Sequence, residues 1–176
     1  MKMTNKEKRR RKRELTFLPT PPEIINRMLD AADIKPGMLI LEPSAGRGDI
    51  ADAIRARGIE PDVMEIDEEK RRILAEKGYQ VVAEDFLTDG GKYDRIVMVP
   101  PFAGHEEIIH VFHAYWRLHD NGRLVSLVSN GRFTRKEWFN RWFKAVGGRS
   151  EEMPAEPYKS KIHPEGLITR MVVIDK

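Results

Sequence analysis

The stretch Leu39-Ile40-Leu41-Glu42-Pro43-Ser44-Ala45-Gly46-Arg47-Gly48-Asp49 is the part of the sequence that predicts the fold. An apolar strand ends at an acidic residue, a turn of small residues follows, and a helix then begins. Such a turn lets backbone N–H groups and a helix N-terminus approach a polar ligand closely. A glycine turn is a weak signal when it stands alone. Here it is the first of four segments along the chain that could contact a ligand.

Strand and helix patterns alternate through the rest of the sequence. Strands of this kind, separated by helices of about ten residues, predict right-handed βαβ units and a doubly wound, mostly parallel sheet. The first helix has Thr20 as its expected cap and Pro21 in its first turn. We expect helices over residues 22–32, 49–57, 68–77, 106–118 and 134–146, and strands over 38–42, 62–67, 79–83, 93–98, 123–128 and 167–174.

The chain of 176 residues suits a single domain preceded by a basic arm. Residues Lys6 to Glu14 hold seven Lys or Arg and two Glu, so this block carries a charge of +5. Because the whole chain has a net charge of +3, the remainder carries −2. We expect residues 1–16 to form a flexible arm and residues 17–176 the folded domain. The block Lys6–Arg13 either contacts nucleic acid or is a solvated extension.

Composition excludes several classes of protein. The absence of cysteine rules out disulfides and zinc–thiolate sites. No apolar run approaches the roughly 20 residues of a membrane span, and the basic N-terminus lacks the apolar core of a secretory signal. We therefore expect a cytoplasmic protein with no membrane partner, and the sequence leaves its oligomeric state open.

Four chemistry-bearing segments fall where strands are expected to end, the edge at which doubly wound sheets bind ligands. Glu42 leads into the turn, a carboxylate in Glu65-Ile66-Asp67 could accept both hydroxyls of a ribose, and Asp85-Phe86 offers an amine acceptor and a flat face for a purine. One adenosine-containing ligand could contact all of them. A dinucleotide fits less well. Its usual Gly-x-Gly-x-x-Gly pattern would need glycine at position 51, which is Ala, and Glu42 would repel a pyrophosphate. An amino-acid ammonium group would suit Glu42, which favours S-adenosylmethionine.

Residues 17–174 resemble a class I S-adenosylmethionine-dependent methyltransferase, a family with a Rossmann-like, seven-stranded sheet and an antiparallel terminal strand. Phe17-Leu18-Pro19-Thr20-Pro21-Pro22 before the glycine turn resembles the amino-methyltransferase branch, notably the small adenine-N6 enzymes of phages and mobile elements. The resemblance implies S-adenosylhomocysteine as product and no metal. It implies these cofactor contacts: Thr20, Pro21, Glu42, Pro43, Ser44, Ala45, Gly46 and Gly48 at the methionine end, Glu65 at the ribose, and Ile66, Asp85 and Phe86 at the adenine.

The fourth segment, Val99-Pro100-Pro101-Phe102, departs from the pattern of that branch. The branch carries Asn or Asp before the two prolines. That side chain and the first proline carbonyl accept hydrogen bonds from the substrate amine, while the aromatic ring stacks on the substrate. An isopropyl group cannot accept a hydrogen bond. Either catalysis is weakened naturally, or Val99 is an introduced substitution, or another residue orients a different substrate; Val99 also simply extends the apolar strand before it.

The function expected from these residues is methyl transfer to an amino nitrogen, with adenine N6 of nucleic acid, DNA before RNA, as the target. Pro100 and Phe102 would present that target, and His105 could line the mouth of the site. The alternatives are a catalytically inactive module that binds S-adenosylmethionine and nucleic acid, and a protein glutamine-amide methyltransferase. We expect His110 and His113 to face solvent or cap a helix rather than bind metal.

Overall fold

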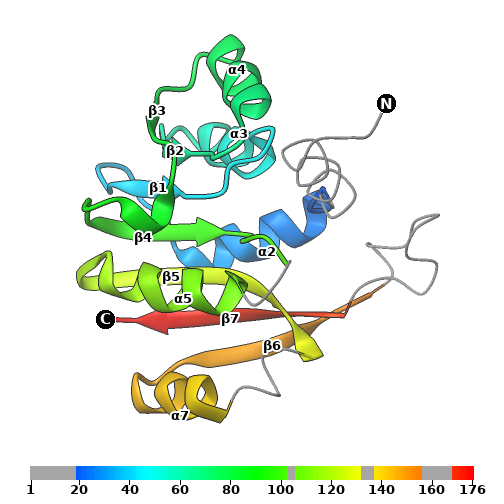
Figure 1. Ribbon diagram of the computed structural model, residues 1–176, viewed down its shortest axis with the longest axis vertical. Helices are drawn as coiled ribbons and strands as arrows, with labels where there is room; N and C mark the ends of the chain where they lie inside the picture. Colours follow the sequence, from blue (N-terminus) through cyan, green and yellow to red (C-terminus); the bar gives the residue numbers. More distant parts are fainter. Residues whose placement is uncertain (1–18, 103–105, 132–136, 156–167) are drawn as a thin grey trace, which may run out of the picture.

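The computed structural model describes residues 19–102, 106–131, 137–155 and 168–176, and within them the chain forms a seven-stranded sheet with helices on both faces (Figure 1). The helices are α2 (Pro22–Ala32), α3 (Asp49–Arg55), α4 (Glu68–Glu76), α5 (Glu106–Trp116) and α7 (Glu137–Ala145), with a 3₁₀ turn η1 (Phe86–Thr88). The strands are β1 (Ile40–Glu42), β2 (Asp62–Met64), β3 (Val81–Ala83), β4 (Tyr93–Met98), β5 (Leu118–Ser129), β6 (Arg149–Met153) and β7 (Thr169–Asp175).

The strand order is β3-β2-β1-β4-β5-β7-β6. Strands β3, β2, β1, β4 and β5 run parallel to one another, whereas β7 is antiparallel to both β5 and β6. The chain order reverses between β1 and β4, so the carboxyl ends of these two strands border the crevice where such sheets bind ligands. The α/β class and the mostly parallel sheet with an antiparallel last strand are confirmed.

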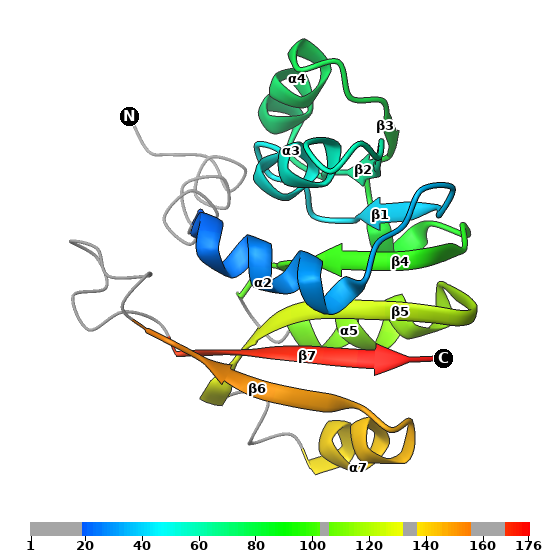
Figure 2. The same ribbon diagram turned by 180° about the vertical axis from the view of Figure 1, so that it is seen from behind.

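Apolar stripes on the helices fix which face of the sheet each one covers. Helix α2 lies across one face, as Figure 2 shows, and buries Ile24, Met28 and Leu29 in a cluster with strand residues such as Val97. On the opposite face α5 and α7 share a second cluster, to which α7 contributes Phe139. A third, smaller cluster joins α3, α4 and β2 through Ala51, Leu74 and Val63.

Two arginines on neighbouring strands hold the C-terminal end of α2. Arg95 of β4 and Arg123 of β5 are paired in the ladder, and their guanidinium groups donate to the carbonyls of Ala32 at 2.7 Å and Ala31 at 2.9 Å. These carbonyls belong to the last turn of the helix, where they lack partners in the helix and where positive charge is favourable. The buried Arg95 therefore anchors α2 against the sheet.

Two sequence-based expectations about local structure are wrong, and one strand was not predicted. Pro21, not Thr20, is the N-cap of α2 and no side chain caps it, because Thr20 lies one residue too early. Strand β5 begins at Leu118 rather than residue 123. Asn121, with φ +65°, donates its N–H to the carbonyl of Lys176, and the N–H of Lys176 donates to the carbonyl of Gly122, so the turn does not end the strand. Segment 149–153 pairs as the edge strand β6 although it shows no strand pattern in the sequence.

Some expectations fall on other parts of the chain. The arm over residues 1–16 and the start of the helix expected from residue 134 lie outside the described residues. Within the described residues, no helix is long and apolar enough to cross a membrane.

Candidate functional site

The turn after β1 is fastened to the neighbouring strand and to α4. The backbone N–H of Ala45 donates to the carbonyl of Met64 at 2.9 Å, and Lys77 Nζ donates to the carbonyl of Arg47 at 2.7 Å. Gly46 and Gly48 have φ of +58° and +90°, a region that favours glycine. Gly48 is also the N-cap of α3, so the helix N-terminus opens directly at the carboxyl edge of the sheet.

Glu42 ends β1 beside this turn and is buried at 2% exposure. Among the described residues its Oε2 has no hydrogen-bond partner. Burial raises the pKa of Glu42 well above its ordinary value of 4.5; the backbone of Ala51 opposes this by donating to the carboxylate, and the nearby carboxylates of Asp49, Asp52 and Glu65 add to it. An isolated buried acid is costly unless a group it can pair with arrives. Oε2 of Glu42 is thus a buried acceptor without a donor among the described residues, which is a property of a binding site.

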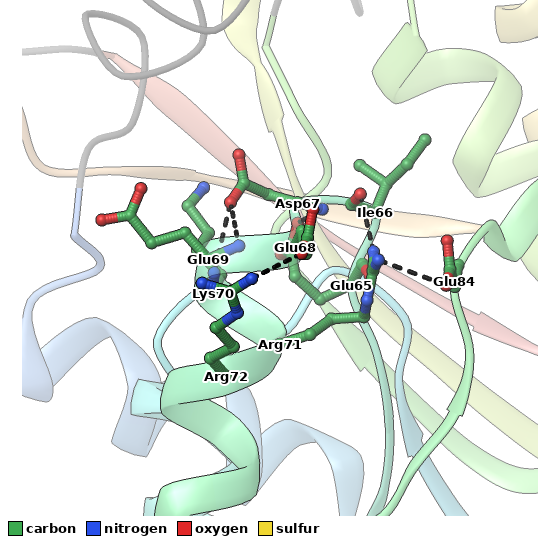
Figure 3. Close-up of polar contacts among 9 residues, drawn as sticks. All are labelled: Glu65, Ile66, Asp67, Glu68, Glu69, Lys70, Arg71, Arg72 and Glu84. Carbon is green, nitrogen blue, oxygen red and sulfur yellow. Dashed lines mark hydrogen bonds and ion pairs between the residues drawn. The ribbon is translucent and has the colours of Figure 1, made fainter.

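Glu65 follows β2 and uses both carboxylate oxygens on the backbone. Its Oε2 accepts from the N–H of Gly46 and its Oε1 from the N–H of Asp67, each at 2.8 Å. It therefore connects the ends of β1 and β2. Each carboxylate oxygen can still accept a second hydrogen bond. Asp67 instead caps α4 by accepting from the N–H groups of Glu69 and Lys70, as Figure 3 shows.

The segment after β3 turns its aromatic ring inward. Phe86 is only 2% exposed and packs edge-on against the ring of His113 on α5, with 4.8 Å between centroids. Burial lowers the pKa of His113, and Arg117 Nε donates to its Nε2. Asp85 caps η1 through the N–H of Leu87. Of the two side chains expected to pack on an adenine, Ile66 is the exposed one, at 49%.

The histidine expectation is corrected by the same packing. His110 is 9% exposed and lies 5.9 Å from the Phe86 ring, so neither it nor His113 faces solvent freely. Within the described residues, no three His, Asp or Glu side chains form a group that could hold a metal ion.

Segment 99–102 follows β4, the other strand at the reversal point. Val99 and Phe102 are partly buried against the cluster beneath α2, Pro100 is buried, and Pro101 is exposed. The helix that begins after Thr20 and Pro21 packs on this same cluster. Val99 and Phe102 therefore share an apolar layer with α2, whereas His105 lies outside the described residues.

Sequence reasoning missed two charged groups at this edge. Glu107 is fully buried on α5 and accepts from the hydroxyl of Ser129 at 2.6 Å, where β5 ends. Its spacing of four from Val111, which is buried, was the available signal. Arg71 donates to backbone carbonyls just after β2. The sequence could not predict this contact, because Arg71 is one of several charged residues on its helix.

Comparison with solved structures places this arrangement among known folds. A candidate RNA methyltransferase from Pyrococcus horikoshii superposes with a TM-score of 0.66 at 18% identity and covers 99% of each chain. The chain shares its fold with this protein.

Two further solved structures share this fold. A dimethyladenosine transferase from Plasmodium falciparum has a TM-score of 0.63 at 16% identity, covering 91% of this chain and 63% of its own. The 16S rRNA N2 G1207 methyltransferase from T. thermophilus, in complex with AdoMet and guanosine, has a TM-score of 0.57 at 16% identity and covers 88% and 38%. No protein-family model and no curated protein sequence matches the chain. At such identities the likeness establishes the fold alone.

Proposed function

We propose that this chain binds S-adenosylmethionine and transfers its methyl group to an exocyclic amino nitrogen of nucleic acid, with adenine N6 as the target. The observation that carries the cofactor assignment is the buried Glu42 carboxylate, whose Oε2 has no hydrogen-bond partner in the part of the chain that the structure describes. A buried carboxylate is stabilised by a charge-assisted hydrogen bond from a cation. The ammonium group of a methionine supplies one, whereas a phosphate would be repelled.

The other residues at this edge fit the rest of the cofactor. The turn with Gly46 and Gly48 lets backbone approach the methionine end, and Glu65 has acceptor capacity left for ribose hydroxyls. Ile66 offers an exposed apolar face and Asp85 a carboxylate at the adenine end. When bound, the cofactor supplies a methyl group activated by a sulfonium.

On the substrate side, the carbonyl of Pro100 is the acceptor for an amine N–H and Phe102 the stacking ring. Orienting the amine lone pair requires accepted hydrogen bonds, and each well-placed one is worth about 10²–10³ in rate. Val99 supplies none. For a base in a duplex, the target must also be turned out of the stack.

The neighbours named for their substrates include RNA and adenosine methyltransferases, which supports a nucleic-acid target without separating RNA from DNA. The block Lys6–Arg13 supplies positive charge for phosphates in this proposal.

A second candidate, a non-catalytic module that binds cofactor and nucleic acid, is favoured by Val99. This side chain packs on the apolar cluster beneath α2, so it serves the core where the related branch has an amide or acid.

The test measures binding of S-adenosylhomocysteine by calorimetry, then transfer of labelled methyl groups to mixed DNA and RNA. We expect Val99→Asn to raise transfer by about 10²–10³-fold. Val99→Leu, which restores no acceptor, is the matched control and should gain nothing. Absence of cofactor binding would refute the proposal. Cofactor binding with no transfer by either Val99 or Asn at position 99 would favour the non-catalytic module.

A further inference from the structure

Arg71 lies in the second turn of α4 and reaches back to the segment that connects β2 with this helix. One guanidinium nitrogen donates to two consecutive carbonyls, those of Glu65 at 3.1 Å and Ile66 at 2.8 Å. The other lies 3.2 Å from a carboxylate oxygen of Glu84, which follows β3 (Figure 3). The Arg71 side chain is 20% exposed. The guanidinium therefore bridges segments that follow two different strands.

This bridge lies beyond the point where the two strands pair. The β2–β3 ladder is short and irregular: it pairs Val63 with Val81 and Met64 with Ala83 and shifts register between them. Glu65, Ile66 and Glu84 come after its last pair. An arginine fork fixes two acceptors in one plane, which a single ladder bond at the strand end would not do.

The carbonyls that Arg71 holds belong to residues with assigned tasks in the proposed site. Fixing the Glu65 and Ile66 carbonyls orients the peptide groups on both sides of Ile66. The first of these residues carries the carboxylate that binds the Gly46 N–H, and the second carries the exposed apolar side chain. A disordered Ile66 would have to be immobilised by the ligand, and this ordering would cost affinity.

We propose that Arg71 is a positioning residue for the adenosine half of the cofactor. It holds the ribose and adenine contacts that follow β2 in place against the end of β3, and it need not touch the ligand itself. This inference rests on the proposed function. The neighbouring Arg72 shows what an ordinary surface arginine does on this helix: its side chain is 73% exposed and pairs with Glu68 one turn away.

The experiment compares Arg71→Met with Arg72→Met in the full-length chain by calorimetric titration. Both changes put an unbranched apolar side chain in place of arginine and so remove one charge. The ligands are S-adenosylhomocysteine and 5′-methylthioadenosine, which contains the adenosine half without the amino acid. We expect Arg71→Met to weaken both ligands by about tenfold, because hydrogen bonds from a charged group are lost. Arg72→Met should change neither by more than about twofold.

Two further variants separate positioning from general stability. Glu42→Gln should weaken S-adenosylhomocysteine but leave 5′-methylthioadenosine unaffected, because Glu42 serves the methionine end. Arg71→Lys keeps the charge without the fork, so it should bind both ligands with intermediate affinity. It is the variant that tests the inference if Arg71→Met folds poorly. Melting temperatures of all variants are measured without ligand.

Each outcome has a defined meaning. A wild-type chain that binds neither ligand overturns the proposed function, and the inference with it. A wild-type chain that binds, with Arg71→Met equal to it, overturns the inference alone. Equal losses in Arg71→Met and Arg72→Met, or a loss confined to S-adenosylhomocysteine, would also overturn it. Parallel losses for both ligands in Arg71→Met alone support it.

Discussion

Replacing Glu42 by glutamine should make the protein more stable and the cofactor site weaker. Because burial raises the pKa of Glu42, the folded state keeps a proton that the unfolded chain has released once the pH exceeds about 4.5. Stability therefore falls as the pH rises from there toward the raised pKa, and then levels off. Glu42→Gln removes this dependence while preserving the size of the side chain.

The size of the gain follows from the burial of Glu42, because glutamine keeps a polar group at this position but carries no charge. An unsatisfied buried polar group costs roughly 1–3 kcal/mol, and more when it is charged. We expect Glu42→Gln to be more stable by about 1–3 kcal/mol at pH 7, or about 2–4 °C in melting temperature per kcal/mol for a chain of this size. The difference should shrink toward zero near pH 4.5.

The assay is chemical unfolding of both proteins between pH 4.5 and 8, with calorimetric binding of S-adenosylhomocysteine alongside. Glu76→Gln, an exposed change on α4, is the control and should stay within about 0.5 kcal/mol of wild type. A glutamine variant that is less stable at pH 7, with an unchanged pH dependence, would refute the description of Glu42 as an isolated buried acid. Unchanged cofactor affinity would refute its role at the methionine end.

Three other predictions concern the turn, a buried histidine and the basic block. Gly48→Ala should cost more stability than Gly58→Ala. Both glycines have positive φ, but a Cβ at position 48 would lie 3.1 Å from Leu74, whereas one at position 58 would have no neighbour within 4 Å among the described residues. Denaturant unfolding should therefore show a loss of about 1 kcal/mol or more for the first variant and less for the second. Burial lowers the pKa of His113, so below about pH 6.5 the unfolded chain takes up a proton that the folded state does not. The free energy of unfolding should therefore be lower at pH 5.5 than at pH 7.5, and this loss should be smaller in His113→Gln. Deleting residues 1–14 should weaken binding to DNA and RNA and flatten its dependence on salt; an unchanged salt slope in filter binding would exclude Lys6–Arg13 as a phosphate contact.

The parts of the fold that the sequence predicts well are those whose local pattern and tertiary environment agree. Helix α2 and strand β4 span the expected residues because a one-sided apolar stripe and a buried apolar run coincide with their final packing. Strand β6 could not be predicted in this way, since Met153 is its one buried residue and its pairing depends on β7, far along the chain. Edge strands with polar side chains carry little periodic signal.

In the candidate site, too, the sequence predicts some features and misses those that depend on packing. That Glu42, Glu65 and Asp85 gather at one edge follows from the rule for parallel strand ends, and the structure has each of them just at or after such an end. The inward turn of Phe86 and the reach of Arg71 do not follow, because both depend on side chains of other helices or strands. Patterns predict where backbone ends lie, whereas the direction of a side chain there is decided by packing.

The place of β7 in the sheet has a consequence for how the chain assembles. This strand follows β5 and β6 in the chain, yet it lies between them in the sheet. Until it emerges from the ribosome, β6 has no sheet partner and β5 presents an open edge that could pair with another chain. The half that carries the proposed cofactor site, from β3 to β5, needs no residue beyond 129 for its own pairing. Proteolysis within residues 169–175 would therefore detach β6 from the sheet and expose the edge of β5.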